Sequence, residues 1–259
     1  MTSYEHPALQ TLPPINSTLL VFGGCGGIGR AIVAAACERG LRVAIADLPQ
    51  SIKQNPPPSE VIAIPCDASQ GPQVQIVFEQ LKAQWGHVRA VINLVGFTKE
   101  QVSVADMNEA EWDEIIDGSQ RSAFLIAHHA YPLLSASAEG ILINTSSTFG
   151  VSVPYAGYAP YGVAKAGIIN LTRALATEFA PKIRVNAIAP GLIDTAFLQG
   201  GTGRPPKTSR VNADAALSKV ALNRIGRPED IAGMAMFLLS PAASYITSQT
   251  LHVNGGMWS

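Results

Sequence analysis

Residues 17–40 read STLLVFGGCGGIGRAIVAAACERG, and this stretch decides the fold. The run STLLVFGG at 17–24 is rich in apolar side chains and is typical of a strand buried on both faces of a sheet. The glycines that follow crowd a tight turn, and apolar residues then recur at helical spacing over 27–39 until Gly40. The stretch therefore predicts a strand, a glycine turn and a helix.

The same alternation continues along the chain. Strands are expected at 42–47, 61–67, 89–96, 140–147, 183–191 and 250–256, and helices at 73–85, within 109–136, at 160–179 and at 229–239. The connection 48–60 holds three consecutive prolines, so we expect a short or irregular helix there. This pattern predicts an α/β fold: a doubly wound parallel sheet of the Rossmann type with about seven strands and helices on both faces. We expect one domain over 1–259, beginning with a leader at 1–16.

Composition narrows the classes of partner. Hydrophobic residues make up 47% of the chain, charged residues 14%, and the formal net charge is -1, so a compact core is expected and a nucleic-acid partner is not. No apolar run reaches about 18 residues, and the first residues lack the order of a signal peptide, which predicts no membrane span and a cytoplasmic location. Three widely spaced cysteines and five scattered histidines predict no disulfide framework and no metal site.

The glycine turn is a candidate phosphate site, because missing side chains let backbone N–H groups approach a pyrophosphate at a helix N-terminus. Asp47 ends the second expected strand, where its carboxylate can accept both ribose hydroxyls and would repel a 2′-phosphate. No basic residue adjoins it, so NAD(H) is favoured over NADP(H); the alternative is that Asp47 only caps a turn. Cys25 in the same turn is either a reactive thiolate or a small residue that fits.

Tyr161 and Lys165 are four residues apart in a helical stretch, so their side chains lie one turn apart on the same face. An ammonium group there stabilises the phenolate and favours proton exchange by the tyrosine, although such a pair also occurs by chance. Ser147 ends the preceding strand, where its hydroxyl can hydrogen-bond a substrate oxygen. The three residues predict hydride transfer at a secondary alcohol or ketone.

The chain resembles the short-chain dehydrogenase/reductase family from its first strand to its end. The motifs that carry the resemblance are GGCGGIG at 23–29, CDAS at 66–69, NLVG at 93–96, NTSS at 144–147, YGVAK at 161–165, RVNAIAPGLIDT at 184–195, and the run from RIGRPED at 224 to NGG at 256. The resemblance implies an NAD-dependent oxidoreductase acting on CH–OH groups, with a small-molecule alcohol or ketone as its partner and a homotetramer as its assembly.

The resemblance also implies roles for individual residues. Tyr161 would be the general acid/base, Ser147 would orient the substrate oxygen, and Lys165 would lower the tyrosine pKa and hold the nicotinamide ribose. The implied cofactor-binding residues are Gly23, Cys25, Gly26, Gly27, Ile28, Asp47, Leu48, Asp67, Ala68, Asn93, Leu94, Val95, Gly96, Tyr161, Lys165, Pro190, Gly191, Ile193 and Thr195.

The sequence departs from the family pattern at several positions. Phe22 replaces a usual Thr, and Leu94 and Val95 replace Asn and Ala, changes that should leave backbone contacts with the cofactor intact. Ser119 stands where the family places an Asn in a water-linked proton relay from the lysine, so the relay is expected to be altered. This substitution leaves open the alternative of a nucleotide-binding sensor that keeps the fold without turnover.

Residues 196–222 interrupt the alternation and are either a lid over the substrate or a surface insertion. Candidate substrate contacts in this segment are Phe197, Leu198, Arg204, Lys207 and Arg210, and candidates at the other edge of the cleft are Val151, Val153, Tyr155 and Tyr158. This mixture suits an aromatic, an alicyclic or an anionic compound, so the sequence leaves the substrate open.

Overall fold

The computed structural model describes residues 10–204 and 216–257. Its centre is a seven-stranded parallel sheet in the order β3-β2-β1-β4-β5-β6-β7. The strands are β1 (Thr18–Phe22), β2 (Arg42–Asp47), β3 (Ile62–Pro65), β4 (Ala90–Asn93), β5 (Gly140–Thr145), β6 (Ile183–Pro190) and β7 (Thr250–Val253). The predicted doubly wound sheet is confirmed, and each strand ends within a few residues of its expected position.

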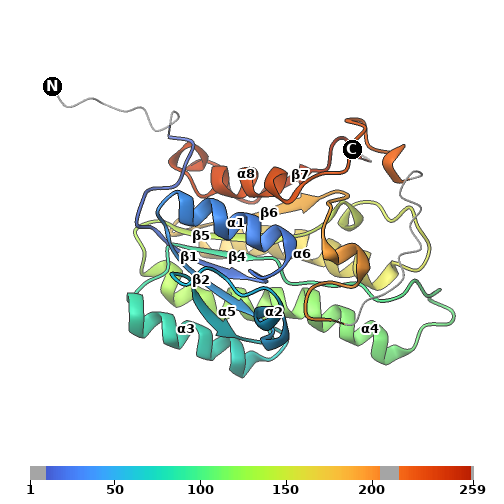
Figure 1. Ribbon diagram of the computed structural model, residues 1–259, viewed down its shortest axis with the longest axis horizontal. Coiled ribbons are helices and arrows are strands. Elements are labelled where there is room, and N and C mark those ends of the chain that lie inside the picture. Colours follow the sequence, from blue (N-terminus) through green and yellow to red (C-terminus); the bar gives the residue numbers. More distant parts are fainter. Residues whose placement is uncertain (1–9, 205–215, 258–259) are drawn as a thin grey trace.

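Helices cover both faces of the sheet (Figure 1). On one face lie α1 (Gly27–Glu38) and α8 (Pro228–Leu238), and on the other lie α3 (Gly71–Trp85), α5 (Ser122–Ser135) and α6 (Ala159–Phe179). Successive residues of β1 alternate between the two layers: Leu19 and Val21 pack with α1 and α8, while Leu20 and Phe22 pack with α3, α5 and α6. The two apolar cores explain why the central strands read as continuous hydrophobic runs.

The connections contain shorter helices. The proline-rich crossover forms only α2 (Pro49–Gln54), the shortened helix that its prolines predict. The helical region expected within 109–136 consists of α4 (Glu109–Ile116), a π-helical turn η2 (Asp117–Arg121) and α5. The π-helical turn was not predicted from the sequence, because an apolar period does not reveal one extra residue in a turn. It holds Ser119.

The sheet topology determines where a binding cleft can form. The strand order reverses at β1, which pairs with β2 on one side and with β4 on the other. The connection from β1 therefore runs toward one edge of the sheet, and the connection from β4 runs toward the other edge. A crevice opens at the carboxyl ends of the strands at such a switch point. Across the part of the chain that the structure describes, no helix is both long and apolar enough to cross a bilayer.

Candidate active site

A cleft of about 590 Å³ lies at the carboxyl ends of the strands. It brings together eighteen of the predicted site residues, which are Gly23, Gly26, Gly27, Ile28, Asp47, Leu48, Asp67, Ala68, Leu94, Val95, Gly96, Ser147, Tyr161, Lys165, Pro190, Gly191, Ile193 and Thr195. Cys25, Asn93 and Ser119 do not line it. Its size is that of a small-molecule site.

The glycine turn forms a cradle at the start of α1. A Cβ atom on Gly27 would lie 2.5 Å from the Thr195 side chain, so a glycine is needed for Thr195 to pack this closely against the turn. Gly26 is the N-cap of α1, and no side chain caps this helix end. A phosphate group therefore fits here, since the first N–H groups of a helix bind anions.

Asp47 connects the end of β2 to the glycine turn. Its Oδ2 accepts the backbone N–H of Cys25 at 2.8 Å, and its Oδ1 accepts the N–H of Leu48 at 2.8 Å. Burial raises the pKa of the Asp47 carboxyl, while these hydrogen bonds oppose the rise. The carboxylate lines the cleft and keeps lone pairs that can accept further hydrogen bonds.

The thiol of Cys25 is not activated. Its side chain is buried in the core beside α1, and burial together with Asp47 raises its pKa to about 12. The interpretation of Cys25 as a reactive thiolate is therefore wrong, because the loss of hydration and a neighbouring carboxylate outweigh the helix N-terminus. Within the turn, Cys25 contributes the N–H that holds Asp47.

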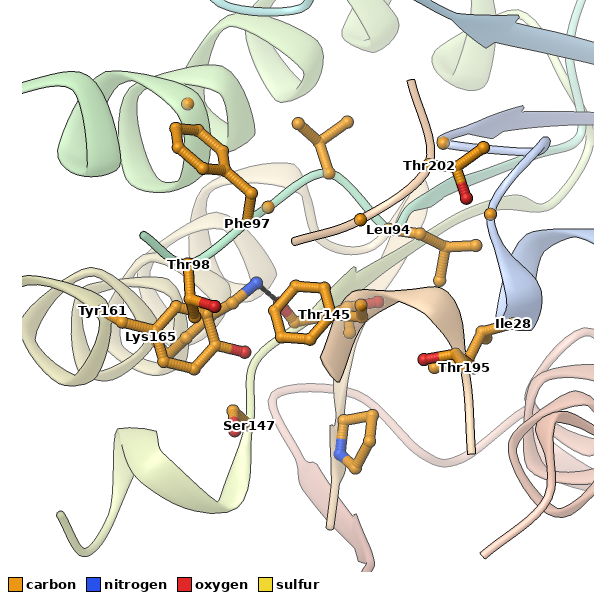
Figure 2. A pocket seen from close by; sticks show the side chains of 18 of the residues that line it. Ile28, Leu94, Phe97, Thr98, Thr145, Ser147, Tyr161, Lys165, Thr195 and Thr202 are labelled. Carbon is orange, nitrogen blue, oxygen red and sulfur yellow. Dashed lines mark hydrogen bonds between the residues drawn. The ribbon is translucent and has the colours of Figure 1, made fainter. Parts of the chain in front are cut away.

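Tyr161, Lys165 and Ser147 meet in the cleft (Figure 2). Lys165 lies one turn after Tyr161 on α6, donates from Nζ to the carbonyl oxygen of Thr145 at 2.8 Å, and stands 5.6 Å from the centroid of the tyrosine ring. The Ser147 hydroxyl is near enough to that of Tyr161 to lower the tyrosine pKa, and its Oγ also accepts the N–H of Phe149 at 3.1 Å. Three side chains that can bind an oxygen or move a proton thus lie together.

Burial dominates the proton affinities of this group. It raises the pKa of Tyr161 to about 12, although the Ser147 hydroxyl acts in the opposite direction, and it lowers the pKa of Lys165 to about 8. The expected acidification of Tyr161 by Lys165 is therefore not present in the protein alone. A buried phenol and a buried ammonium group both favour their neutral forms.

Ser119 lies behind the cleft, close to Lys165. A Cβ atom on Gly96 would stand 2.9 Å from Nζ of Lys165 and 3.4 Å from Oγ of Ser119, so the three residues meet at one point. Ser119 is fully buried, and its Oγ has no hydrogen-bond partner among the described residues. A buried hydroxyl without a partner is costly unless a water molecule satisfies it.

Residues 200–204, which we call the strap, cross the cleft and contact both of its walls. On the α2 side, Oγ of Ser51 donates to the carbonyl oxygen of Thr202 at 3.1 Å, and Oε1 of Gln54 accepts the N–H of Gly203 at 2.9 Å. On the other side, the Arg204 guanidinium lies 3.5 Å from the Phe97 ring centroid. Residues 196–204 thus belong to the wall of the cleft; residues 205–215 of the predicted lid, with Lys207 and Arg210, lie outside the described residues.

Comparisons with known proteins support one family. The family model described as enoyl-(acyl carrier protein) reductase matches residues 24–258. The chain is 33% identical over 252 residues to the 3-oxoacyl-(acyl-carrier-protein) reductase of Staphylococcus epidermidis, covering 94% of this chain and 100% of the relative. The corresponding reductase of Thermotoga maritima is 30% identical over 245 residues and covers 92% of this chain and 96% of its own.

Solved structures agree. A short-chain dehydrogenase/reductase from Brucella melitensis, described as a glucose/ribitol dehydrogenase, has a TM-score of 0.84 at 29% identity over 96% of this chain and 99% of its own. A 3-ketoacyl-(acyl-carrier-protein) reductase from the same organism, solved with NADH, has a TM-score of 0.84 at 25% identity over 94% of this chain and 98% of its own. The chain belongs to the short-chain dehydrogenase/reductase family. It is an oxidoreductase that acts on a CH–OH or ketone group with a nicotinamide dinucleotide, and the sensor alternative finds no support.

The cleft of this dehydrogenase/reductase also contains residues that the sequence did not predict. Phe97, Phe149, Ser51, Thr202, Glu114 and Met257 line the cleft without having been predicted. Phe97 directly follows the NLVG motif, and Phe149 follows Ser147 by two residues. Their closeness in sequence to these motifs could have identified both as residues of the cleft. Of the predicted substrate contacts, Tyr155, Tyr158, Phe197, Leu198 and Arg204 line the cleft, whereas Val151 and Val153 line a separate shallow groove.

Proposed function

We propose that this protein interconverts a secondary alcohol and its ketone with NAD(H), using Tyr161 as the general acid/base. The observation that carries the proposal is that Ser147, Tyr161 and Lys165 lie together in the cleft that the glycine turn and Asp47 also line. A substrate oxygen placed between the two hydroxyls would be oriented by Ser147 and would exchange its proton with Tyr161. When bound, the nicotinamide dinucleotide supplies or accepts the hydride.

Lys165 has two roles in this proposal. Its ammonium group, fixed by the Thr145 carbonyl oxygen, is placed to hold a ribose hydroxyl and to stabilise the Tyr161 phenolate. Because burial keeps the phenol protonated in the protein alone, we infer that acidification of Tyr161 occurs only in the loaded enzyme. Ser119 and a bridging water would return the proton from Lys165 to solvent.

The preference for NAD(H) over NADP(H) rests on Asp47. Its carboxylate holds the N–H groups of Cys25 and Leu48 and repels a 2′-phosphate brought to the same place. The other cleft residues that were predicted to bind the cofactor keep those roles as proposals. Cys25 and Asn93 do not line the cleft, and their predicted roles are likewise proposals. The homotetramer and the cytoplasmic location also stay predictions; sedimentation analysis tests the first and localisation of a tagged chain the second.

Substitution of Tyr161 by Phe tests the catalytic assignment. Tyr161→Phe removes the hydroxyl and keeps the ring, so NADH binding should be unchanged while kcat falls by at least about 100-fold. Tyr131→Phe, on the exposed face of α5, is the matched control. Retention of more than a tenth of the wild-type kcat by the Tyr161 variant would show that another group moves the proton.

A further inference from the structure

Two phenylalanines from separate segments contact the ring of Tyr161, and a third belongs to the same apolar cluster. Phe149 lies in η3 (Thr148–Gly150) and Phe197 in η4 (Ala196–Gln199), with ring centroids 6.1 Å and 5.9 Å from that of the tyrosine. Phe97, which follows β4, belongs to the same apolar cluster and lines the cleft; its ring lies toward the helical segment that holds Gly118 (Figure 2). The reacting position is thus enclosed by aromatic rings.

Further side chains hold these rings in place and extend the apolar wall. Tyr158 and Tyr155 contact the ring of Phe149, at 5.1 Å and 6.2 Å between centroids. Leu192 and Met257, which pack together in a separate apolar cluster, also line the cleft. Because aromatic pairs favour tilted and edge-to-face arrangements at these separations, the wall around Tyr161 is preorganised for another ring.

The cations of the cleft are already engaged. Among the described residues that line it, the cations are Lys165 and Arg204. Lys165 donates to Thr145, while Arg204 stacks on Phe97 with Nη1 3.7 Å from Oε1 of Glu114. Glu114 also pairs with Lys99. A carboxylate or phosphate on the substrate would compete with these partners for the two cations, which disfavours an anionic compound.

We propose that the substrate is a compact ketone that carries a ring next to its carbonyl group, or the alcohol derived from such a ketone. The ring would lie between Phe149 and Phe197, and the carbonyl oxygen would lie at Tyr161 and Ser147. The proposal rests on the proposed function and names the substrate class of that site. A rigid ring gains stacking contacts and loses little conformational entropy, whereas a flexible acyl chain must be ordered to fit. This class differs from the 3-oxoacyl substrates in the names of the curated relatives.

Three methyl ketones of matched size and one acyl thioester test the substrate class. The probes are acetophenone, cyclohexyl methyl ketone, 2-octanone and the N-acetylcysteamine thioester of 3-oxooctanoate, each reduced with NADH. We expect kcat/KM for the two ring ketones to exceed that for 2-octanone and for the thioester at least tenfold. An equal or higher value for either chain substrate would overturn the ring proposal and leave the oxidoreductase function intact. Failure of all four probes would contradict the proposed function itself.

Variants of the aromatic wall supply the second measurement. Phe149→Leu and Phe197→Leu keep an apolar side chain but remove the ring, so kcat/KM for acetophenone should fall fivefold to tenfold while that for 2-octanone changes less than twofold. Phe124→Leu is the control, since Phe124 is exposed on α5 and stacks on His128 outside the cleft. Equal losses for both ketones would mean that the rings only support the fold, and would also overturn the proposal.

Discussion

The carboxylate of Asp47 accepts the backbone N–H of Cys25 at 2.8 Å, a contact that ties the end of β2 to the glycine turn. Because the Leu48 N–H binds the other carboxylate oxygen, the charge is fixed at the point where the adenosine ribose is expected. Cofactor choice and the shape of the turn therefore depend on the same side chain.

Asp47→Asn should weaken the preference for NAD(H). The amide keeps one acceptor oxygen but loses the charge that repels a 2′-phosphate, so the ratio of kcat/KM for NADH to that for NADPH should fall by about 10- to 100-fold, the range of a hydrogen bond to a charged group. Steady-state kinetics with both cofactors measures this ratio. Asp106→Asn, on an exposed loop, serves as control. An unchanged ratio would remove Asp47 from cofactor selection.

Burial of Lys165 predicts a rise of stability with pH in the cofactor-free protein. The folded lysine, with its pKa lowered from 10.5 to about 8, releases its proton before the unfolded one does, so the unfolded state binds more protons between these values and stability increases across them. Tyr161 acts in the opposite direction, but only above pH 10, because its pKa rises from 10.0 to about 12.

Urea unfolding at two pH values measures this effect. From pH ~7.5 to pH ~9.5, the free energy of unfolding of the wild type should rise by about 2 kcal/mol relative to that of Lys165→Met, since other titrating groups cancel in the difference. Lys182→Met, at an exposed position, should follow the wild type. A constant difference between wild type and Lys165→Met would show that Lys165 does not titrate in this interval.

Ser119→Ala should lower the rate of turnover without lowering the stability of the fold. Removing a buried hydroxyl that has no hydrogen-bond partner among the described residues should leave the free energy of unfolding unchanged or raise it by about 1 kcal/mol. If Oγ holds the relay water, kcat should fall about threefold to tenfold and its pH dependence should shift, while the KM for NADH stays constant. Ser240→Ala, a buried serine far from Lys165 that donates to Phe237, is the control. A wild-type pH profile in the Ser119 variant would argue against the relay.

Gln54→Ala should loosen the strap. The variant leaves the Gly203 N–H without its acceptor, and one hydrogen bond of ordinary strength corresponds to about fivefold faster release of NADH. Stopped-flow fluorescence measures that rate, and the affinity for ADP-ribose should fall by the same factor if the strap holds the adenosine half. Lys53→Ala, exposed on the same helix, is the matched control.

A second strap variant, Gly203→Ala, tests the same contact in case the effect of Gln54→Ala is small. Gly203 has φ +73°, and a Cβ there would lie 2.3 Å from Oγ of Ser51, so Gly203→Ala should displace the strap from α2 and speed release further. Release at the wild-type rate in both variants would show that the strap does not retain the dinucleotide.

Much of this protein follows from local sequence patterns. The seven strands, the glycine turn and the short helix before Pro56 can be predicted because periodicity, glycine content and proline act within a few residues. The same holds for Tyr161 and Lys165, whose four-residue spacing on a helix fixes their relative direction. The π-helical turn at Ser119 could not be predicted, since it changes the helix by a single residue.

The tertiary structure alone decided the environment of these residues. Burial sets the proton affinities of Cys25, Tyr161 and Lys165, and burial depends on the segments that the topology packs around them. The contact between Ser51 and Thr202 joins residues 151 positions apart, and the rings of Phe149 and Phe197 reach Tyr161 from different loops. Short-range patterns specify the elements and the direction of their side chains, whereas the chemistry of the cleft arises from contacts that form only when distant segments fold onto one sheet edge.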